Sequence, residues 1–327
     1  MPAEQSPHLV VPFASCSGGA WLQAMKNMPK GNTANIGKLL QGMKLVNSDL
    51  GESLSLSPPH ERVLARALGL AGAGDLVDGL IPWAAAQAVK TLGPAANADT
   101  AWAFVTPCHW TMGREHATLT DPAALALTPV ESQALMSAMQ PYFATEGITL
   151  HYAWPECWLA EGEPFRQLAT ASLDRVLGRN VDAWLPGAKT APSLRRLQNE
   201  MQMLLYTHPL NDERANHGQL SVNSFWLSGT GALARPAAAA AEDLDTPRTL
   251  AQAAFTDDWS AYTTAWAELD TGDVAQLLAQ QRAGHAVRLS LCGESSAQTY
   301  KTVPRSFFSQ ISSFLAPQPL LNVLEQL

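Results

Sequence analysis

Charged residues are scarce in this 327-residue chain, where Asp, Glu, Lys and Arg together make up 15% and the formal net charge is −8. The basic residues are scattered, and the densest basic spot is the pair Arg195 and Arg196. Proteins that bind nucleic acids or acidic membrane surfaces do so mainly through clustered Lys and Arg. We therefore expect neither a nucleic acid nor a membrane to be a partner of this chain.

Cysteines are few, and targeting signals are lacking. The four cysteines lie far apart and form no Cys-x-x-Cys pair: Cys16, Cys108, Cys157 and Cys292. Such isolated thiols are typical of a reducing compartment. The N-terminal stretch has no basic region ahead of an apolar run, and the apolar stretch LGLAGAGDLVDGLIPW is interrupted by Asp75, Asp78 and Pro82. The sequence thus predicts a cytoplasmic protein without a secretory signal or a membrane span.

The chain is 46% hydrophobic, which is enough for a sizeable core. The clearest predicted helix is TPVESQALMSAMQP, where Thr128 and Glu131 form a T-x-x-E capping box, Pro129 takes the first helical position, and we expect an end before Pro141. Further helices are expected at 32–43, 58–72, 78–91, 193–207, 248–255, 259–268 and 273–282 and at the C-terminus. Strands are expected at 8–15, 101–106, 116–121, 148–154, 157–161, 221–229 and 286–292, and a linker at 232–248. Helices mixed with short apolar strands indicate an α/β class.

The stretch HPLNDERANHGQLSVNSFWLSGTG, residues 208 to 231, is the principal candidate site. His208, Asn211 and Arg214 would converge on an anion, because Arg offers a planar fork that suits carboxylate or phosphate. The alternative is structural: Asn211 caps a short helix that Gly218 ends, and Arg214 forms a salt bridge. Asn223 is expected to be a buried amide that bonds to a nearby loop backbone.

Two glycines follow the strand expected at 221–229. Gly229 and Gly231 belong to GTGALA, which reads G-x-G-x-x-A and predicts either a dinucleotide-binding loop or a tight turn. Pro236 falls where the helix of a nucleotide-binding loop should already be running, and it therefore favours the turn.

A secondary candidate site lies in TPCHWTMGREH. Cys108 and His109, close to Glu115 and His116, indicate either a thiol or metal site or a turn with a half-buried cysteine. A zinc site would need more ligands at better spacing, and the turn is the simpler interpretation.

Another candidate is SLDRVLGRNVDAW, where Arg175 and Arg179 alternate with Asp174 and Asp182. These residues predict either an anion clamp or a surface ion-pair network.

Five separated stretches, in order, resemble the RpfE-type regulatory protein family of proteobacteria: TPCHWTMG, LTDPAALALTPVESQALMSAMQPYF, LDRVLGRNVDAWLP, NEMQMLLYTHPLN and VNSFWLSGTG. The resemblance covers roughly residues 99 to 231. It implies a regulatory role and no particular chemical activity.

The 208–231 stretch and TANIGKLL are also similar, more distantly, to the archaeal-type cofactor-independent phosphoglycerate mutases of the alkaline-phosphatase superfamily. That likeness implies an α/β core sheet flanked by helices, with an inserted α+β lobe. The family's two-metal ligands are replaced here: the first strand runs LVVPFAS without a carboxylate, Gly37 stands for an Asp, Ser57 is only a positional stand-in for the nucleophile, and Glu294 stands alone near the C-terminus. Two divalent ions need several carboxylates and imidazoles, so the core is expected to be degenerate.

We therefore expect an α/β core at 1–98 and 186–327 and an inserted lobe at 99–185. The expected function is that of a non-catalytic regulatory or adaptor protein that binds a small phosphorylated or carboxylate ligand, with no metal and no cofactor. One alternative is a divergent metal-dependent phosphotransferase or phosphohydrolase. A further one is a protein-interaction module with a protein partner, since ten tryptophans could form an apolar patch.

Overall fold

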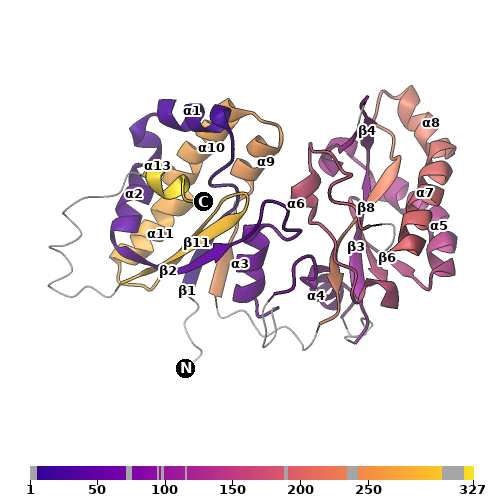
Figure 1. Cartoon of the computed structure of the whole chain (residues 1–327), viewed down its shortest axis with the longest axis horizontal. Helices are drawn as coiled ribbons and strands as arrows, with labels where there is room; N and C mark the ends of the chain where they lie inside the picture. The colour runs from indigo at the N-terminus through magenta and orange to yellow at the C-terminus, as the bar shows by residue number, and fades with distance from the viewer. Residues whose placement is uncertain are drawn as a thin grey trace. The chain divides into compact units, whose positions relative to one another are not determined.

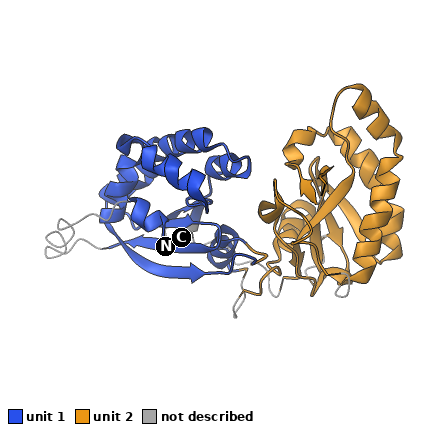
Figure 2. Ribbon diagram, turned by 45° about the horizontal axis from the view of Figure 1, so that its top comes forward, with its two compact units in different colours: residues 1–54, 58–69, 239–327 blue, residues 55–57, 70–238 orange. Residues whose placement is uncertain are grey.

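The structure is a computed structural model that describes residues 6–70, 76–93, 96, 99–114, 116–187, 191–233, 242–303 and 320–327. The chain divides into two compact units (Figure 2): unit 1 comprises residues 1–54, 58–69 and 239–327, and unit 2 comprises 55–57 and 70–238. Within the described part, no helix has the length and apolarity needed to cross a bilayer. Glu115 and residues 234–241 of the predicted linker lie outside the described residues, and the linker prediction is wrong for residues 242–245, which form a strand.

Unit 1 is built on a five-stranded mixed sheet in the order β2-β11-β10-β1-β9. Its strands are β1 (Ser6–Val11), β2 (Met43–Leu50), β9 (Glu242–Asp245), β10 (Arg288–Cys292) and β11 (Ser296–Thr302). Strand β1 runs parallel to β9 and β10, while β11 is antiparallel to β10 and β2. Alternation along β1 separates two apolar layers: Leu9 and Val11 face one cluster, and Val10 faces another with Val63.

The larger layer of unit 1 holds most of its helices (Figure 1): α1 (Gly19–Asn27), the 3₁₀ turn η1 (Lys30–Thr33), α2 (Ala34–Gln41), α9 (Thr249–Phe255), α10 (Trp259–Thr271), α11 (Asp273–Arg282) and α13 (Leu320–Leu324). Helix α3 (Pro59–Ala67) packs on the opposite layer against β1, β10 and β11. This central mixed sheet flanked by helices confirms the α/β class.

Unit 2 holds a four-stranded antiparallel sheet in the order β6-β7-β3-β8. Its strands are β3 (Trp102–Cys108), β6 (Thr149–Trp154), β7 (Cys157–Glu161) and β8 (Ser224–Gly231), with a separate hairpin of β4 (Trp110–Met112) and β5 (Ala117–Leu119). Its helices are α4 (Trp83–Leu92), η3 (Pro122–Leu125), α5 (Pro129–Thr145), η4 (Glu163–Phe165), α6 (Leu173–Val176), α7 (Pro192–Tyr206) and α8 (Pro209–Asn216). Helices α5 and α7 cover one face, and α4 covers the other.

Helix α5 shows one confirmed prediction and one wrong one. Its capping box is present: Thr128 Oγ1 accepts from the Glu131 N–H, and a Glu131 carboxylate oxygen accepts from the Thr128 N–H. The helix does not end before Pro141 but continues to Thr145. Phe143 is fully buried and its ring lies 5.4 Å from that of Phe225, so packing of the last turn offsets the hydrogen bond that proline cannot donate.

Several other features differ from expectation. Strands β2, β9 and β11 did not stand out in the sequence, and Cys108–Trp110 is not a turn, since the chain reverses between Gly113 and His116 instead. Unit 2 also extends beyond the predicted lobe of 99–185. It includes α4 and β8 because β8 is hydrogen-bonded along β3 and α4 packs on both strands.

Candidate functional site

The stretch after α7 folds as a second, capped helix. His208 is the N-cap of α8, and its Nδ1 accepts a hydrogen bond from the Leu210 N–H at 3.2 Å. The cap expected at Asn211 is wrong, because Pro209 already takes the first helical position and Asn211 lies inside the helix. Gly218 follows the helix with φ +69°, the left-handed geometry expected of it.

Asn211 is 8% exposed and is held entirely by backbone groups. Its Nδ2 donates to Leu205 O at 2.7 Å and to Val222 O at 2.8 Å, and its Oδ1 accepts from the Val222 N–H at 2.9 Å. These three bonds tie the end of α7 to the segment that enters β8. The side chain thus connects two elements, and its amide oxygen and nitrogen point to the backbone.

Arg214 is also bonded within the protein through all three of its guanidinium nitrogens. Its side chain is 1% exposed, its Nε donates to Leu220 O at 2.8 Å, its Nη1 lies 2.7 Å from Glu131 Oε1, and its Nη2 donates to Leu125 O. Burial would raise the pKa of Glu131, but hydrogen bonds from Thr128 and Arg214 hold it below its ordinary value. The guanidinium therefore serves as a buried bridge between α5 and α8, and this favours the structural alternative over the anion site.

Asn223 precedes β8 and pairs with the backbone of β4. Its Oδ1 accepts from the Trp110 N–H at 2.7 Å, and its Nδ2 donates to Trp110 O at 2.9 Å. It is half-buried and, as expected, bonds to a neighbouring backbone. It lies near the start of the strand, away from the two glycines at its end.

Gly229 and Gly231 form neither a nucleotide-binding loop nor a tight turn, because β8 continues through both. The pairing of β8 with β3 shifts here, and Gly229 has φ +62° and Gly231 φ +133°. A Cβ on Gly229 would lie 2.9 Å from Phe104 Cδ2 and 3.0 Å from Trp83 Cβ. The glycines are thus required by a strand irregularity and by the close approach of α4.

Cys108 and His109 do not form a reactive pair. Cys108 is fully buried at the end of β3, and burial raises the pKa of its thiol well above its ordinary value. His109 Nδ1 donates to Ser221 O at 2.8 Å. A buried thiol with a raised pKa is a poor nucleophile and a poor metal ligand.

Arg175 and Arg179 differ in their exposure to solvent. Arg175 is 4% exposed, its Nη2 donates to Ser57 O at 3.4 Å, and its guanidinium carbon lies 5.8 Å from the centre of the Trp184 ring. Arg179 is exposed, whereas Asp174 is buried. The predicted surface network is therefore wrong for Asp174 and Arg175, which lie inside unit 2.

In unit 1, aromatic side chains fill the end of β1. The phosphoglycerate-mutase resemblance would place a metal-binding carboxylate there. Phe13 is 4% exposed, and its ring lies 4.9 Å from Phe255 and 5.9 Å from His60. Tyr262 Oη donates to Phe13 O at 2.7 Å and accepts from Trp21 Nε1 at 3.3 Å. Phe13 adopts φ +53°, which places its side chain in this cluster at a cost in backbone strain.

The other residues at positions of the resembled family's catalytic groups have structural roles. Ser57 is 2% exposed, and its Oγ accepts from the Gly79 N–H at 2.9 Å. Glu294 accepts from the Ser17 N–H at 2.9 Å, and Gly37 lies within α2. Among the described residues, no group of three or more His, Cys, Asp and Glu side chains is arranged to hold a metal ion.

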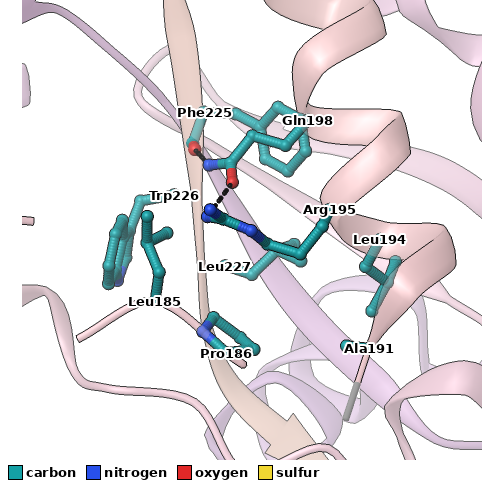
Figure 3. Close-up of a pocket in the computed structure, with 9 residues that line it drawn as sticks. All are labelled: Leu185, Pro186, Ala191, Leu194, Arg195, Gln198, Phe225, Trp226 and Leu227. Atoms are coloured by element: carbon teal, nitrogen blue, oxygen red, sulfur yellow. Dashed lines mark hydrogen bonds between the residues drawn. The ribbon is translucent and has the colours of Figure 1, made fainter. Parts of the chain in front are cut away.

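A pocket in unit 2 lies between α7, β8 and the segment before α7. Figure 3 shows its lining, which is apolar except for two side chains: Leu185, Pro186, Ala191, Leu194, Arg195, Gln198, Phe225, Trp226 and Leu227. The space is about 340 Å³ with its solvent-open part included, and the part in which the centre of a water molecule fits is only about 20 Å³. Arg195 is half-buried and extends from α7 toward β8, where its Nη1 meets Gln198 Oε1 at 3.4 Å.

Arg195 differs from its neighbour in sequence. Arg196 is 65% exposed on its side chain and forms ion pairs with Glu146 and Glu200. Within the described residues, no acidic side chain lines the pocket around Arg195. The sequence does not reveal this site, because helical spacing places Arg195 and Gln198 opposite the apolar stripe of α7. In the structure Gln198 is 8% exposed and donates to Phe225 O at 3.2 Å. The one signal in the sequence is that Arg195 follows Leu194 and Gln198 follows Leu197, two residues of the apolar stripe.

Comparison with protein-family models and with curated proteins finds no match. Among solved structures, the chain is similar to a cofactor-independent phosphoglycerate mutase from Thermoplasma acidophilum, at 13% identity and a TM-score of 0.36 over 99% of this chain and 100% of that one. It is also similar to the PH0037 protein from Pyrococcus horikoshii, at 13% identity and a TM-score of 0.43 over 91% and 87% of the two chains. Both are distant likenesses that assign no activity to this chain.

Proposed function

We propose that this protein is a non-catalytic regulatory or adaptor protein that binds a small anion, and that the anion binds at the Arg195 pocket. The His208–Arg214 turn, the site favoured by the sequence, is a structural element in this proposal. The RpfE-type regulatory role and the cytoplasmic setting predicted from the sequence belong to the same proposal.

The observation that carries the proposal is the environment of Arg195. Its guanidinium lies among apolar side chains and bonds to a neutral amide at 3.4 Å, a long contact for a charged donor. A cation in an apolar pocket gains most from an anion, because Coulomb attraction strengthens as water is displaced. Arg196, on the same helix, already has carboxylate partners.

The non-catalytic part of the proposal is supported by the end of β1. A two-metal reaction needs carboxylates and imidazoles at the ends of the core strands. Here Phe13 and the aromatic residues around it fill the end of β1 with a packed cluster. An ion placed there would have to displace buried apolar groups.

The test combines binding with turnover on the full chain. Thermal shift is measured with inorganic phosphate, 3-phosphoglycerate and small carboxylates, for the wild type, Arg195→Gln and the matched control Arg196→Gln. We expect at least one anion to raise the melting temperature of the wild type and of Arg196→Gln but not of Arg195→Gln. Phosphate-ester hydrolysis and mutase activity are assayed in parallel with Mn²⁺ and Zn²⁺.

Two results would contradict the proposal. Turnover of a phosphate ester with tightly bound metal would favour the divergent phosphotransferase. A stabilising anion whose effect survives in Arg195→Gln would place the site elsewhere.

A further inference from the structure

We infer that unit 1 contains a ligand site of its own, a cavity between β9, β1 and α11 that binds an aliphatic diamine. This site goes beyond the proposed function: it lies in the other unit from the Arg195 pocket and does not depend on anion binding there. The inference follows from the size of the cavity and from the side chains on its two walls.

The cavity has the size of a small-molecule site. The part in which the centre of a water molecule fits is about 310 Å³. Small-molecule sites typically have volumes of about 300–1,000 Å³. The cavity can therefore hold a short aliphatic ligand without rearrangement of the core.

One wall of the cavity is the helix-covered face of the sheet at its β9 edge. Asp245 lies opposite Leu9 in the parallel pairing of β9 with β1. Leu9 belongs to the apolar cluster that the helices of unit 1 cover, so Asp245 faces the helices as well. Asp243 lies two residues earlier on β9 and therefore shares that face.

The other wall is one side of α11. Asp273, Gln276, Leu277 and Gln280 line the cavity, and their spacing along the chain places them on a single face of the helix. Leu277 is buried in the same apolar cluster as Leu9. These two leucines give the cavity an apolar floor, and carboxylates and amides form its walls.

The charge of the lining is negative. Asp243, Asp245 and Asp273 carry it, and neither Lys nor Arg is among the described residues that line the cavity. Within the described part of the chain, none of these three carboxylates has an ion-pair partner. His8 also lines the cavity, but its Nε2 is hydrogen-bonded to Ser290 Oγ at 2.8 Å.

The two walls repel each other electrostatically. Burial, together with the negative charge of Asp245 on the facing wall, raises the pKa of Asp273 above its ordinary value. A cation bound between the two walls would replace this repulsion by attraction.

A diamine matches this arrangement better than a compact ion does. Its two ammonium groups can bind carboxylates on opposite walls, and its methylene chain can lie on Leu9 and Leu277. The amide oxygens of the two glutamines can accept the remaining N–H groups. A small metal ion needs ligands that converge on one point, and no three His, Cys, Asp or Glu side chains of the described residues do so.

The experiment is isothermal titration of the full chain at low ionic strength with putrescine, n-butylamine and Mg²⁺. We expect putrescine to bind about tenfold or more tightly than n-butylamine, because its second ammonium group adds one charged hydrogen bond. Mg²⁺ should bind more weakly than putrescine.

Two cavity variants and one control locate the site. Asp245→Asn and Asp243→Asn should each weaken putrescine binding about tenfold. Both carboxylates are exposed, so each variant should fold, and its melting temperature without ligand verifies this. Glu268→Gln removes the same charge from an exposed position of α10 that does not line the cavity, and it should bind putrescine like the wild type.

The opposite results overturn the inference. Silence with putrescine, or equal binding of putrescine and n-butylamine, would show that the two walls do not hold a dication. Tighter binding of Mg²⁺ would make the cavity a metal site. Equal loss in Glu268→Gln and in the cavity variants would show only a general attraction of cations to an acidic protein. The thermal shifts with phosphate and carboxylates test the Arg195 pocket separately, so either site can fail without the other.

Discussion

Replacing Arg214 with Ala tests whether the turn that dominates the sequence is structural. The wild-type side chain is 1% exposed and bonds to two backbone carbonyls and to Glu131. Arg214→Ala leaves both carbonyls and the carboxylate without these donors and leaves a cavity in their place. We expect a large loss of stability rather than a selective loss of binding.

The magnitude follows from the contacts. Breaking a buried ion pair costs about 3–5 kcal/mol. Glu131 keeps 19% of its side-chain surface exposed and its bonds to Thr128, which favours the lower end of that range. For a unit of this size each kcal/mol lowers the melting temperature by roughly 2–4 °C, so about 3 kcal/mol corresponds to a fall of roughly 6–12 °C.

Differential scanning calorimetry measures the effect, with Arg196→Ala as the matched control. Arg196 is 65% exposed on its side chain, and exposed ion pairs contribute about 0–1 kcal/mol, so its variant should melt close to the wild type. An Arg214→Ala protein that melts within about 2 °C of the wild type, on the same scale, would show that the guanidinium is not a structural bridge. The sequence-derived anion site would then regain its support.

Three further perturbations follow from the structure. Gly229→Ala should destabilise the protein by about 2–3 kcal/mol in chemical denaturation, because φ is +62° and the new Cβ would lie 2.9 Å from Phe104 Cδ2. Gly218→Ala is the control: it also has a positive φ but has open space around it, so it should cost only about 1 kcal/mol. Burial would raise the pKa of Asp49, but hydrogen bonds from Arg62 and Arg66 hold that pKa below its ordinary value of 3.8. The ionised carboxylate therefore stabilises the folded state above pH 3.8, and this stabilisation is lost as the pH falls through the lower pKa of the folded state. Asp49→Asn should thus be less stable than the wild type at pH 7, and its stability should depend less on pH in the acid range. All four cysteines are buried and form no disulfide, so a thiol reagent should label them after denaturation and not before. Rapid labelling of the native protein would contradict the packing.

The parts of the fold that could be predicted are those with local causes. The capping box of Thr128 and Glu131 marks the start of α5, and the short apolar stretches at 148–154 and 157–161 mark the antiparallel pair β6 and β7. The end of α5 could not be predicted, because Phe143 holds the helix past Pro141 through a contact with Phe225, which is distant in sequence. Tertiary packing here outweighs the local rule.

Strand β9 illustrates the same limit. Its sequence EDLD has poor strand propensity, yet it pairs in parallel with β1 at the edge of the sheet. Its four residues lie inside the stretch 232–248 that reads as a linker, so nothing local distinguishes strand from linker.

The candidate site was hidden for a related reason. Helical periodicity places Arg195 and Gln198 on the polar side of α7, and no local pattern reveals that β8 and the Leu185–Pro186 segment cover that side. By contrast, the convergence of His208, Asn211 and Arg214 looked like a ligand site because the residues that satisfy them lie elsewhere in the sequence.

The most direct test of the proposed anion site is a residue-resolved NMR titration of the full chain with inorganic phosphate and, separately, with acetate. We predict that the largest shifts fall on the Gln198 side-chain amide and the Trp226 indole, with the backbone of α8 unchanged, and that these shifts disappear in Arg195→Gln. Shifts centred on His208 to Gly218, with the pocket unaffected, would contradict the account.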